Sequence, residues 1–255
     1  LFRSPEKVMD YIKAEGKYPV VIKADGLALG KGVLICQNER EAADCVKEIM
    51  LDKKFGASGN HVVVEEFLTG PEVSVLSFCD GKTVKPMVSS MDHKRALDHD
   101  EGLNTGGMGT VAPNPYYTPA VAERCMQEIF LPTVAAMQAE GCPFKGCLYF
   151  GLMLTPDGPK VIEYNCRFGD PETQVVLPLL ESDLLTVMEA TTNGTLDKTD
   201  VKFSDGAAAC VILASGGYPL AYEKGKEITG LTAGQLDAAD VTVYHAGTAI
   251  KDGDR

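Results

Sequence analysis

The sequence predicts an α+β protein with two lobes followed by a further C-terminal segment. The first 67 residues run helix, hairpin, helix and strand, and residues 68–197 carry longer strands together with helices. Near residues 193–205 the composition turns polar, which is typical of a domain boundary, and the run GAAACVILASGGYP begins a new segment. We therefore expect domains at residues 1–67, 68–197 and 198–255, with ligand chemistry where the two lobes face each other.

The first lobe is expected to begin with a capped helix. Ser4 suits the N-cap, Pro5 the first helical position and Glu6 the first turn. The runs YPVVIKADG and KGVLICQ predict two strands joined by a glycine-containing loop, and NEREAADCVKEIML predicts an amphipathic helix. The valine-rich run HVVVEEFL completes this lobe as a strand.

The second lobe is expected to hold a larger antiparallel sheet. In EVSVLSFCDGKTVKPMVSS, Asp80-Gly81 marks a hairpin turn between two strands. Residues 92–118 are rich in Gly, Asn, Pro and charge, so we expect regular structure to lapse there. Helices are predicted for residues 119–140 and throughout TQVVLPLLESDLLTVMEATTN, and between them GCLYFGLMLT and GPKVIEYN predict an antiparallel strand pair.

Composition limits the classes of function. The chain has 255 residues, is 45% hydrophobic and carries a formal net charge of -12, which argues against a general nucleic-acid binder. It contains neither an apolar run of membrane-spanning length nor a signal-type N-terminus, so we expect a cytoplasmic protein without a membrane partner. The four histidines and eight cysteines show no metal-ligand spacing and predict no zinc site.

The run VVIKADGLALGKGV predicts a phosphate-binding loop. Lys23 is the only charge in an apolar strand, and the following loop holds Gly26, Gly30, Lys31 and Gly32. Glycines let backbone N–H groups surround an anion, and lysines add point charges. Because the spacing departs from the Walker A pattern, we interpret it as a hairpin loop of another kind. The alternative is an ordinary hairpin with Lys23 directed to the surface.

Two further segments combine charges with turns. EEFLTGPE ends a strand with Glu65 and Glu66 and places Glu72 after a Gly-Pro turn, which favours nucleotide contacts but also fits solvated turn carboxylates. MDHKRALDHDEGLNTGGMGT sets charges beside a glycine-rich backbone nest, which suits an anionic substrate or, alternatively, a surface charge run. The candidate residues of this second segment are Asp92, His93, Lys94, Arg95, Thr105, Gly106, Gly107 and Gly109.

The run KVIEYNCRFGDPET carries the most specific pattern. Alternation along a strand would place Glu163, Asn165 and Arg167 on one face. Carboxylate and carboxamide oxygens suit Mg2+, and a guanidinium suits a transferred phosphoryl group, whereas the alternative is a structural cross-strand salt bridge. Asp170 and Glu172 are interpreted as loop and helix-start carboxylates.

Taken together, these motifs resemble the ATP-grasp superfamily and, more narrowly, the glycinamide ribonucleotide synthetase family of purine synthesis. The run NCRFGDPE together with DHKR and NTGGMG is specific to that family. The resemblance implies an ATP-grasp fold with two α+β lobes around an ATP cleft and with part of a small β-rich C-terminal domain. It implies a ligase that joins glycine to 5-phosphoribosylamine through glycyl phosphate, yielding ADP and phosphate. It further implies that the family's N-terminal substrate domain is absent from this chain, and that this piece binds Mg-ATP but is weakly active or inactive alone.

The resemblance also implies residue roles. Lys23 and residues 26–32 hold the ATP phosphates, and the adenine and ribose contacts are Glu65, Glu66, Leu68 and Glu72. Mg2+, with Mn2+ as an alternative, binds Glu163 and Asn165, while Gly151 occupies the position of a third metal carboxylate found in many ATP-grasp enzymes. Arg167 serves the phosphoryl group, and the segments at residues 92–95 and 105–109 serve glycine or phosphoribosylamine.

The expected assembly is a monomer whose partners are these small-molecule substrates. Two alternatives remain: another ATP-grasp carboxylate-amine ligase, and a non-catalytic nucleotide-binding module.

Overall fold

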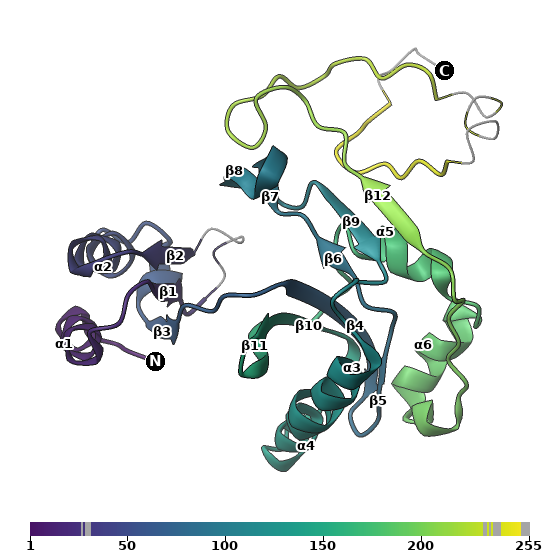
Figure 1. The fold of residues 1–255 in the computed structure, drawn as a ribbon, viewed down its shortest axis with the longest axis horizontal. Helices are drawn as coiled ribbons and strands as arrows, with labels where there is room; N and C mark the ends of the chain where they lie inside the picture. Colours follow the sequence, from purple (N-terminus) through teal and green to yellow (C-terminus); the bar gives the residue numbers. More distant parts are fainter. Residues whose placement is uncertain (27, 29–31, 232–233, 235, 237–240, 251–255) are drawn as a thin grey trace. The chain divides into compact units, whose positions relative to one another are not determined.

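The computed structural model describes residues 1–26, 28, 32–231, 234, 236 and 241–250 (Figure 1). The chain divides into two compact units, Leu1–Thr69 and Gly70–Arg255. The division therefore falls after Thr69, close to the expected end of the first lobe at Phe67. A separate C-terminal domain from residue 198 stays a prediction.

The first unit is a three-stranded antiparallel sheet with helices. Helix α1 (Pro5–Glu15) begins as predicted, because the Ser4 side chain accepts a hydrogen bond from the Lys7 N–H. The sheet has the order β2 (Val33–Cys36), β1 (Val20–Ala24), β3 (Val62–Glu66). Helix α2 (Glu39–Val46) continues as a π-helical turn, Lys47–Leu51, and a 3-10 turn follows at Gly56–Gly59. The predicted order of helix, hairpin, helix and strand is confirmed.

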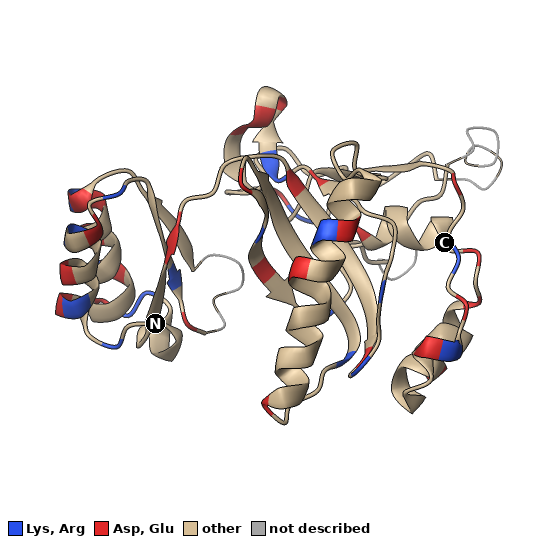
Figure 2. Cartoon of the chain, turned by 60° about the horizontal axis from the view of Figure 1, so that its bottom comes forward, with Lys and Arg blue, Asp and Glu red and all other residues tan. Residues whose placement is uncertain are grey.

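Charges of both signs occur along the helices of this unit (Figure 2). Lys13 on α1 lies 3.1 Å from Glu39 on α2, so the two helices are joined by a surface ion pair as well as by the core. That core is built of apolar side chains from both helices and from the sheet, among them Val8, Ile12, Ile22, Ile49 and Val62. The unit thus buries a hydrophobic cluster of its own.

The second unit is organised on a four-stranded antiparallel sheet. Its order is β11 (Gly158–Asn165), β10 (Lys145–Thr155), β4 (Glu72–Asp80), β5 (Val84–Pro86). Both faces are covered, because Phe150 packs in one cluster with Phe130 while Tyr149 packs in the other with Val176. The predicted hairpin turn is confirmed, since Asp80 Oδ1 accepts from the N–H groups of Lys82 and Thr83 at 3.0 and 2.7 Å.

Helical segments lie on the two faces of this sheet. The predicted helix over residues 119–140 is confirmed as a continuous helical stretch: α3 (Pro119–Cys125), a π-helical turn (Met126–Phe130) and α4 (Leu131–Ala139). The expected single helix after residue 173 is wrong. It divides into α5 (Thr173–Val176), a 3-10 turn (Leu177–Leu179) and α6 (Leu184–Asn193), and another 3-10 turn follows at Leu196–Lys198. The division occurs because Pro178 lacks an N–H and Asp183 caps a new helix by accepting from the Thr186 N–H at 2.8 Å.

The expectation that regular structure lapses over residues 92–118 is also wrong. A three-stranded sheet has the order β12 (Ala208–Val211), β9 (Gly109–Ala112), β6 (Met91–Asp92), and β7 (Arg95–Leu97) pairs with β8 (Glu101–Asn104) around a 3-10 turn (Asp98–Asp100). The β7–β8 hairpin is largely exposed, so it lacks the apolar alternation that predicts a strand. Strand β9 pairs with strands that are distant in the sequence, which local patterns do not report.

Candidate active site

The two predicted metal ligands lie at the end of β11, an edge strand. Gly151 of β10 is paired with Glu163, and a bulge lies between Gly151 and Leu152. Asn165 Nδ2 donates to Glu163 Oε1 at 3.2 Å, so the two side chains share a face. A Cβ atom at position 151 would lie 3.1 Å from Glu163 Cγ. Glycine at this position therefore leaves room for the Glu163 carboxylate.

This pair fits a magnesium ion. Within the described ranges, no three His, Cys, Asp or Glu side chains are grouped to hold a metal. Mg2+ in ATP-dependent sites takes one or two protein oxygens and completes its shell with phosphate and water oxygens. Because Asn165 Nδ2 donates to Glu163 Oε1, the oxygens that can face such an ion are Oδ1 of Asn165 and Oε2 of Glu163.

The predicted row of side chains ends at Asn165. Strand β11 stops there, and Arg167 follows in a bend, where its Nη1 donates to the Phe168 carbonyl oxygen at 2.8 Å. The prediction that Arg167 shares the strand face is therefore wrong, because alternation of side chains persists only as long as the strand does. The guanidinium is exposed, and its role with a phosphoryl group stays a prediction.

Lys94 lies among carboxylates from three different strands. Its Nζ is 3.0 Å from Glu72 Oε2, at the first position of β4. Burial lowers the pKa of Lys94, but the negative charges of Glu72, Glu163 and Asp92 outweigh this effect and leave the pKa above its ordinary value. Lys94 therefore stays protonated. Glu72, Glu163 and Asp92, which were predicted separately to bind ribose, metal and substrate, all lie near this cation.

Asp92 ends β6 with a partly unsatisfied carboxyl group. In the part of the chain that the structure describes, its Oδ1 is buried without a hydrogen-bond partner. Burial, together with the negative charge of Glu172, raises the pKa of Asp92 to about 7, although the positive charge of Lys94 acts in the opposite direction. Asp92 can therefore gain or lose a proton near neutral pH, as a group that accepts a proton during catalysis must.

The glycine loop, residues 105–109, packs directly on Asp92. A Cβ atom at Gly107 would overlap Pro171 and lie 2.8 Å from Asp92 Oδ1. The loop's N–H groups have protein acceptors: Thr105 N donates to the Lys94 carbonyl at 2.7 Å, and Gly107 N to Thr105 Oγ1 at 3.0 Å. An anion bound by this backbone would have to replace such an acceptor, so its predicted role as an anion nest stays a prediction.

Backbone hydrogen bonds also join the glycine loop to the DHKR run. The N–H of Met108 donates to the carbonyl oxygen of His93, and the N–H of His93 donates to that of Gly109, at 2.8 and 2.9 Å. Arg95 lies in the β7–β8 hairpin, where its Nη1 donates to the Gly102 carbonyl at 2.7 Å. The DHKR run therefore places Asp92 and Lys94 at the carboxylate cluster and engages Arg95 in its own hairpin.

Glu172 starts α5, as the sequence suggested, and is 4% exposed. Its Oε1 accepts hydrogen bonds from the Tyr149 hydroxyl at 3.0 Å and from Ser74 Oγ at 3.2 Å. Neither Ser74 nor Tyr149 was predicted from the sequence as a site residue. The sequence offered one signal for them: each places a hydroxyl group in an otherwise apolar strand, and the two strands were expected to belong to one sheet.

In the first unit, two residues predicted to contact ATP pair with each other. Lys23 Nζ lies 2.6 Å from Glu65 Oε2. A Cβ atom at Gly26 would lie 2.8 Å from Ser58 Cα, and one at Gly32 would lie 2.6 Å from Ala28 Cβ, so both glycines are required by packing. Glu66, the last residue of β3, is exposed, and Leu68, two residues beyond the strand, is half-buried. Gly30 and Lys31 lie outside the described residues.

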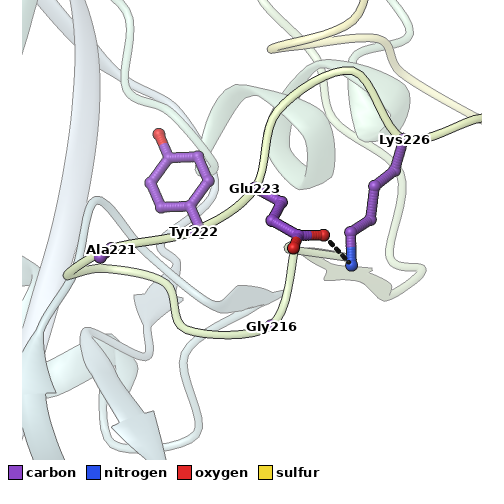
Figure 3. A pocket seen from close by; sticks show the side chains of 5 residues that line it. All are labelled: Gly216, Ala221, Tyr222, Glu223 and Lys226. Carbon is purple, nitrogen blue, oxygen red and sulfur yellow. Dashed lines mark ion pairs between the residues drawn. The ribbon is translucent and has the colours of Figure 1, made fainter.

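A hollow of about 530 Å³ lies in the segment after β12 and is lined by Gly216, Ala221, Tyr222, Glu223 and Lys226 (Figure 3). Glu223 and Lys226 form an ion pair of 3.0 Å across part of it. None of the residues predicted for the site lines this hollow, so it is distinct from the carboxylate cluster.

Among the described residues, no helix has the length and apolar character of a membrane span.

The fold is that of the ATP-grasp proteins. It superposes on a biotin carboxylase from Campylobacter jejuni with a TM-score of 0.61 over 81% of this chain and 44% of that one, at 16% sequence identity. Residues 1–173 match the family model for the phosphoribosylglycinamide synthetase ATP-grasp (A) domain, and residues 208–255 match the model for the C domain. The chain belongs to the phosphoribosylglycinamide synthetase family.

Individual relatives agree with this membership. The chain is 48% identical over 254 residues to a phosphoribosylamine–glycine ligase from Vibrio vulnificus, covering 99% of this chain and 58% of that protein. It is 49% identical over 253 residues to the trifunctional purine biosynthetic protein adenosine-3 of Gallus gallus, covering 99% and 25%. The crystal structure of a phosphoribosylamine–glycine ligase from Thermotoga maritima superposes with a TM-score of 0.81 at 37% identity, covering 89% and 57%. The chain thus spans about 58% of the length of the Vibrio ligase.

Proposed function

We propose that this chain carries the ATP-binding and metal-binding part of a phosphoribosylamine–glycine ligase. In the reaction, ATP phosphorylates the glycine carboxylate, and the amine of 5-phosphoribosylamine then displaces phosphate to give glycinamide ribonucleotide, ADP and phosphate. A carboxylate is a poor electrophile, so the acyl phosphate supplies the leaving group, and the site contributes chiefly positioning and charge stabilisation. The observation that carries the proposal is the Lys94 cluster with Glu72, Asp92 and Glu163, in a chain that matches ligase relatives at 48% identity.

The residues of the cluster suit separate tasks in this reaction. Glu163 and Asn165 would hold Mg2+, which neutralises phosphate charge when bound, and Mn2+ would serve in its place. Lys94 would attract the negative charge of an acyl phosphate. Asp92, with its pKa raised to about 7, would take the proton that the attacking amine releases. Arg167 would contact the transferred phosphoryl group. Lys23 and the loop after it would contact the remaining ATP phosphates.

Phosphate release by the complete polypeptide tests this proposal. We expect release to require ATP, Mg2+, glycine and phosphoribosylamine together, and to fall by about a hundredfold or more in Glu163→Ala. The control is Glu140→Ala, which removes an exposed carboxylate at the end of α4. Release with a different acid or amine would favour another ATP-grasp ligase, and Mg-ATP binding without turnover would favour a non-catalytic nucleotide-binding module.

Assembly and the activity of this stretch alone are separate parts of the proposal. We expect a cytoplasmic monomer, and we expect residues 1–255 alone to bind Mg-ATP with weak turnover or none. Sedimentation gives the mass of the species in solution, and calorimetry gives the affinity for Mg-ATP. Turnover by residues 1–255 equal to that of the complete polypeptide would contradict the expected weakness.

A further inference from the structure

The segment after β12 is attached to the glycine loop at successive points. Strand β12 pairs with β9, the strand in which the loop ends. The N–H of Ile212 then donates to the carbonyl oxygen of Met108 at 3.0 Å. Farther along the segment, the hydroxyl of Tyr218 accepts from the N–H of Gly106 at 3.1 Å, a contact between residues 112 positions apart. The chain after β12 therefore follows the loop instead of leaving it.

Tyr218 is held in place by its own surroundings. Its N–H donates to the Ser215 carbonyl oxygen at 3.2 Å, and the N–H of Leu220 donates to that of Gly217 at 3.0 Å. Gly217 has a φ of 96°, a left-handed conformation that favours glycine. The ring of Tyr218 meets the ring of Tyr222 edge-on, with centroids 5.6 Å apart. A tight turn and a ring contact thus fix the direction of the hydroxyl group.

The opposite side of the loop contacts the carboxylate cluster. Gly107 lies against Asp92 and Pro171, and Thr105 bonds the backbone of Lys94 through both its N–H and its Oγ1, at 2.7 and 2.8 Å. A displacement of Gly106 would therefore move the chain that packs on Asp92 and Lys94. Of the acceptors that hold the N–H groups of residues 105–108, Tyr218 is the one contributed by a distant segment.

We propose that Tyr218 is a positioning residue that holds the glycine loop, and through it Asp92 and Lys94, in the geometry that glycine and phosphoribosylamine require. This inference rests on the proposed function. The predicted nucleotide contacts lie in other segments of the chain. Loss of the Tyr218 hydroxyl should therefore weaken binding of the two ligation substrates and leave binding of ATP unchanged. The residue acts through the backbone of the loop and does not itself meet reacting atoms.

Hydrogen exchange of Tyr218→Phe tests the contact directly. We expect the amide of Gly106 to exchange about fivefold to tenfold faster, the factor that corresponds to one neutral hydrogen bond. The amides of β10 serve as an internal reference for global opening. The matched control is Tyr222→Phe, which removes one hydroxyl from the same pair of rings and leaves the Tyr218–Gly106 hydrogen bond in place. Unchanged exchange at Gly106 in Tyr218→Phe would overturn the proposal.

Kinetics of the complete polypeptide test the consequence. We expect Tyr218→Phe to raise the KM for glycine or phosphoribosylamine about fivefold while the KM for ATP stays constant, and Tyr222→Phe to change neither. Faster exchange at Gly106 with unchanged KM values would show that the loop needs no such support and would overturn the positioning role. Absence of turnover in the wild type would contradict the proposed function, whereas exchange at Gly106 would still decide whether Tyr218 holds the loop.

Discussion

At the scale of single residues, Asp92 shows how burial converts an ordinary carboxyl group into one that titrates near neutral pH. Its Oδ1 is buried and, among the described residues, has no hydrogen-bond partner. Burial, with a smaller contribution from the charge of Glu172, raises its pKa from the ordinary 3.8 to about 7. The folded state therefore binds the proton more tightly than the unfolded chain does. The stability gained from this proton is fully present below about pH 4 and is lost as the pH rises to about 7.

We expect Asp92→Asn to remove this pH dependence. Between pH 4 and 7 the free energy of unfolding of the wild type should fall relative to that of the variant, by about 1.4 kcal/mol for each unit that separates the two pKa values. Urea denaturation at a series of pH values measures the difference. Asp205→Asn, at an exposed carboxylate, is the control. Parallel curves for the wild type and Asp92→Asn would show that this carboxyl group is not perturbed.

Gly107 illustrates crowding combined with backbone conformation. Its φ is 121°, and a Cβ there would overlap Pro171 and approach Asp92 Oδ1 to 2.8 Å. Gly141 has a φ of 74°, but a Cβ there would meet nothing within 4 Å. We expect Gly141→Ala to cost about 1–2 kcal/mol of stability for its backbone, and Gly107→Ala to cost about 1–3 kcal/mol more because of the overlap. Equal losses in thermal unfolding would contradict the close approach of the loop to Asp92.

At the scale of elements, the Glu172 carboxylate joins β4, β10 and the start of α5. Ser74 Oγ lies 2.8 Å from the Tyr149 hydroxyl, and both groups donate to Glu172 Oε1. All three residues are at most 6% exposed. A buried carboxylate is stable only when protein groups donate hydrogen bonds to it, because water does not reach it to take their place. The network therefore ties the helix start to the centre of the sheet.

Tyr149→Phe should reveal the energy of this network. We expect a loss of about 1–3 kcal/mol in the free energy of unfolding, because a buried acceptor loses a donor. Tyr164→Phe is the matched control, since the Tyr164 hydroxyl bonds Thr133 Oγ1 at 3.0 Å at an exposed position. That variant should lose less than about 1 kcal/mol. Similar losses in denaturant titrations of the two variants would argue against a buried network at Glu172.

At the scale of the whole molecule, each of the two units has its own hydrophobic core. Ile22 belongs to the core of the first unit and Phe150 to a core of the second, and both are 0% exposed. Separate cores predict that the units unfold in separate transitions. The chain between Phe67 and Pro71 is then expected to act as a connection, with Phe67 38% exposed.

Calorimetry of two core variants tests this independence. Ile22→Ala should lower the midpoint of one transition only, at a cost of about 2–5 kcal/mol, and Phe150→Ala should lower the midpoint of the other, at about 3–5 kcal/mol. Each variant serves as the control for the other. A single transition that both variants shift together would show that the units unfold as one.

The sequence by itself determined the α+β class, the capped first helix and the hairpins. These features depend on side-chain periodicity and turn residues within a few positions, which a local pattern reports. Only the tertiary structure decided that Lys94 meets Glu72, that Glu172 is buried against Ser74, and that Tyr218 meets Gly106. These partners are 22, 98 and 112 positions apart. Their contacts arise when separate strands and loops pack, so the spacing of residues along the chain carries no record of them.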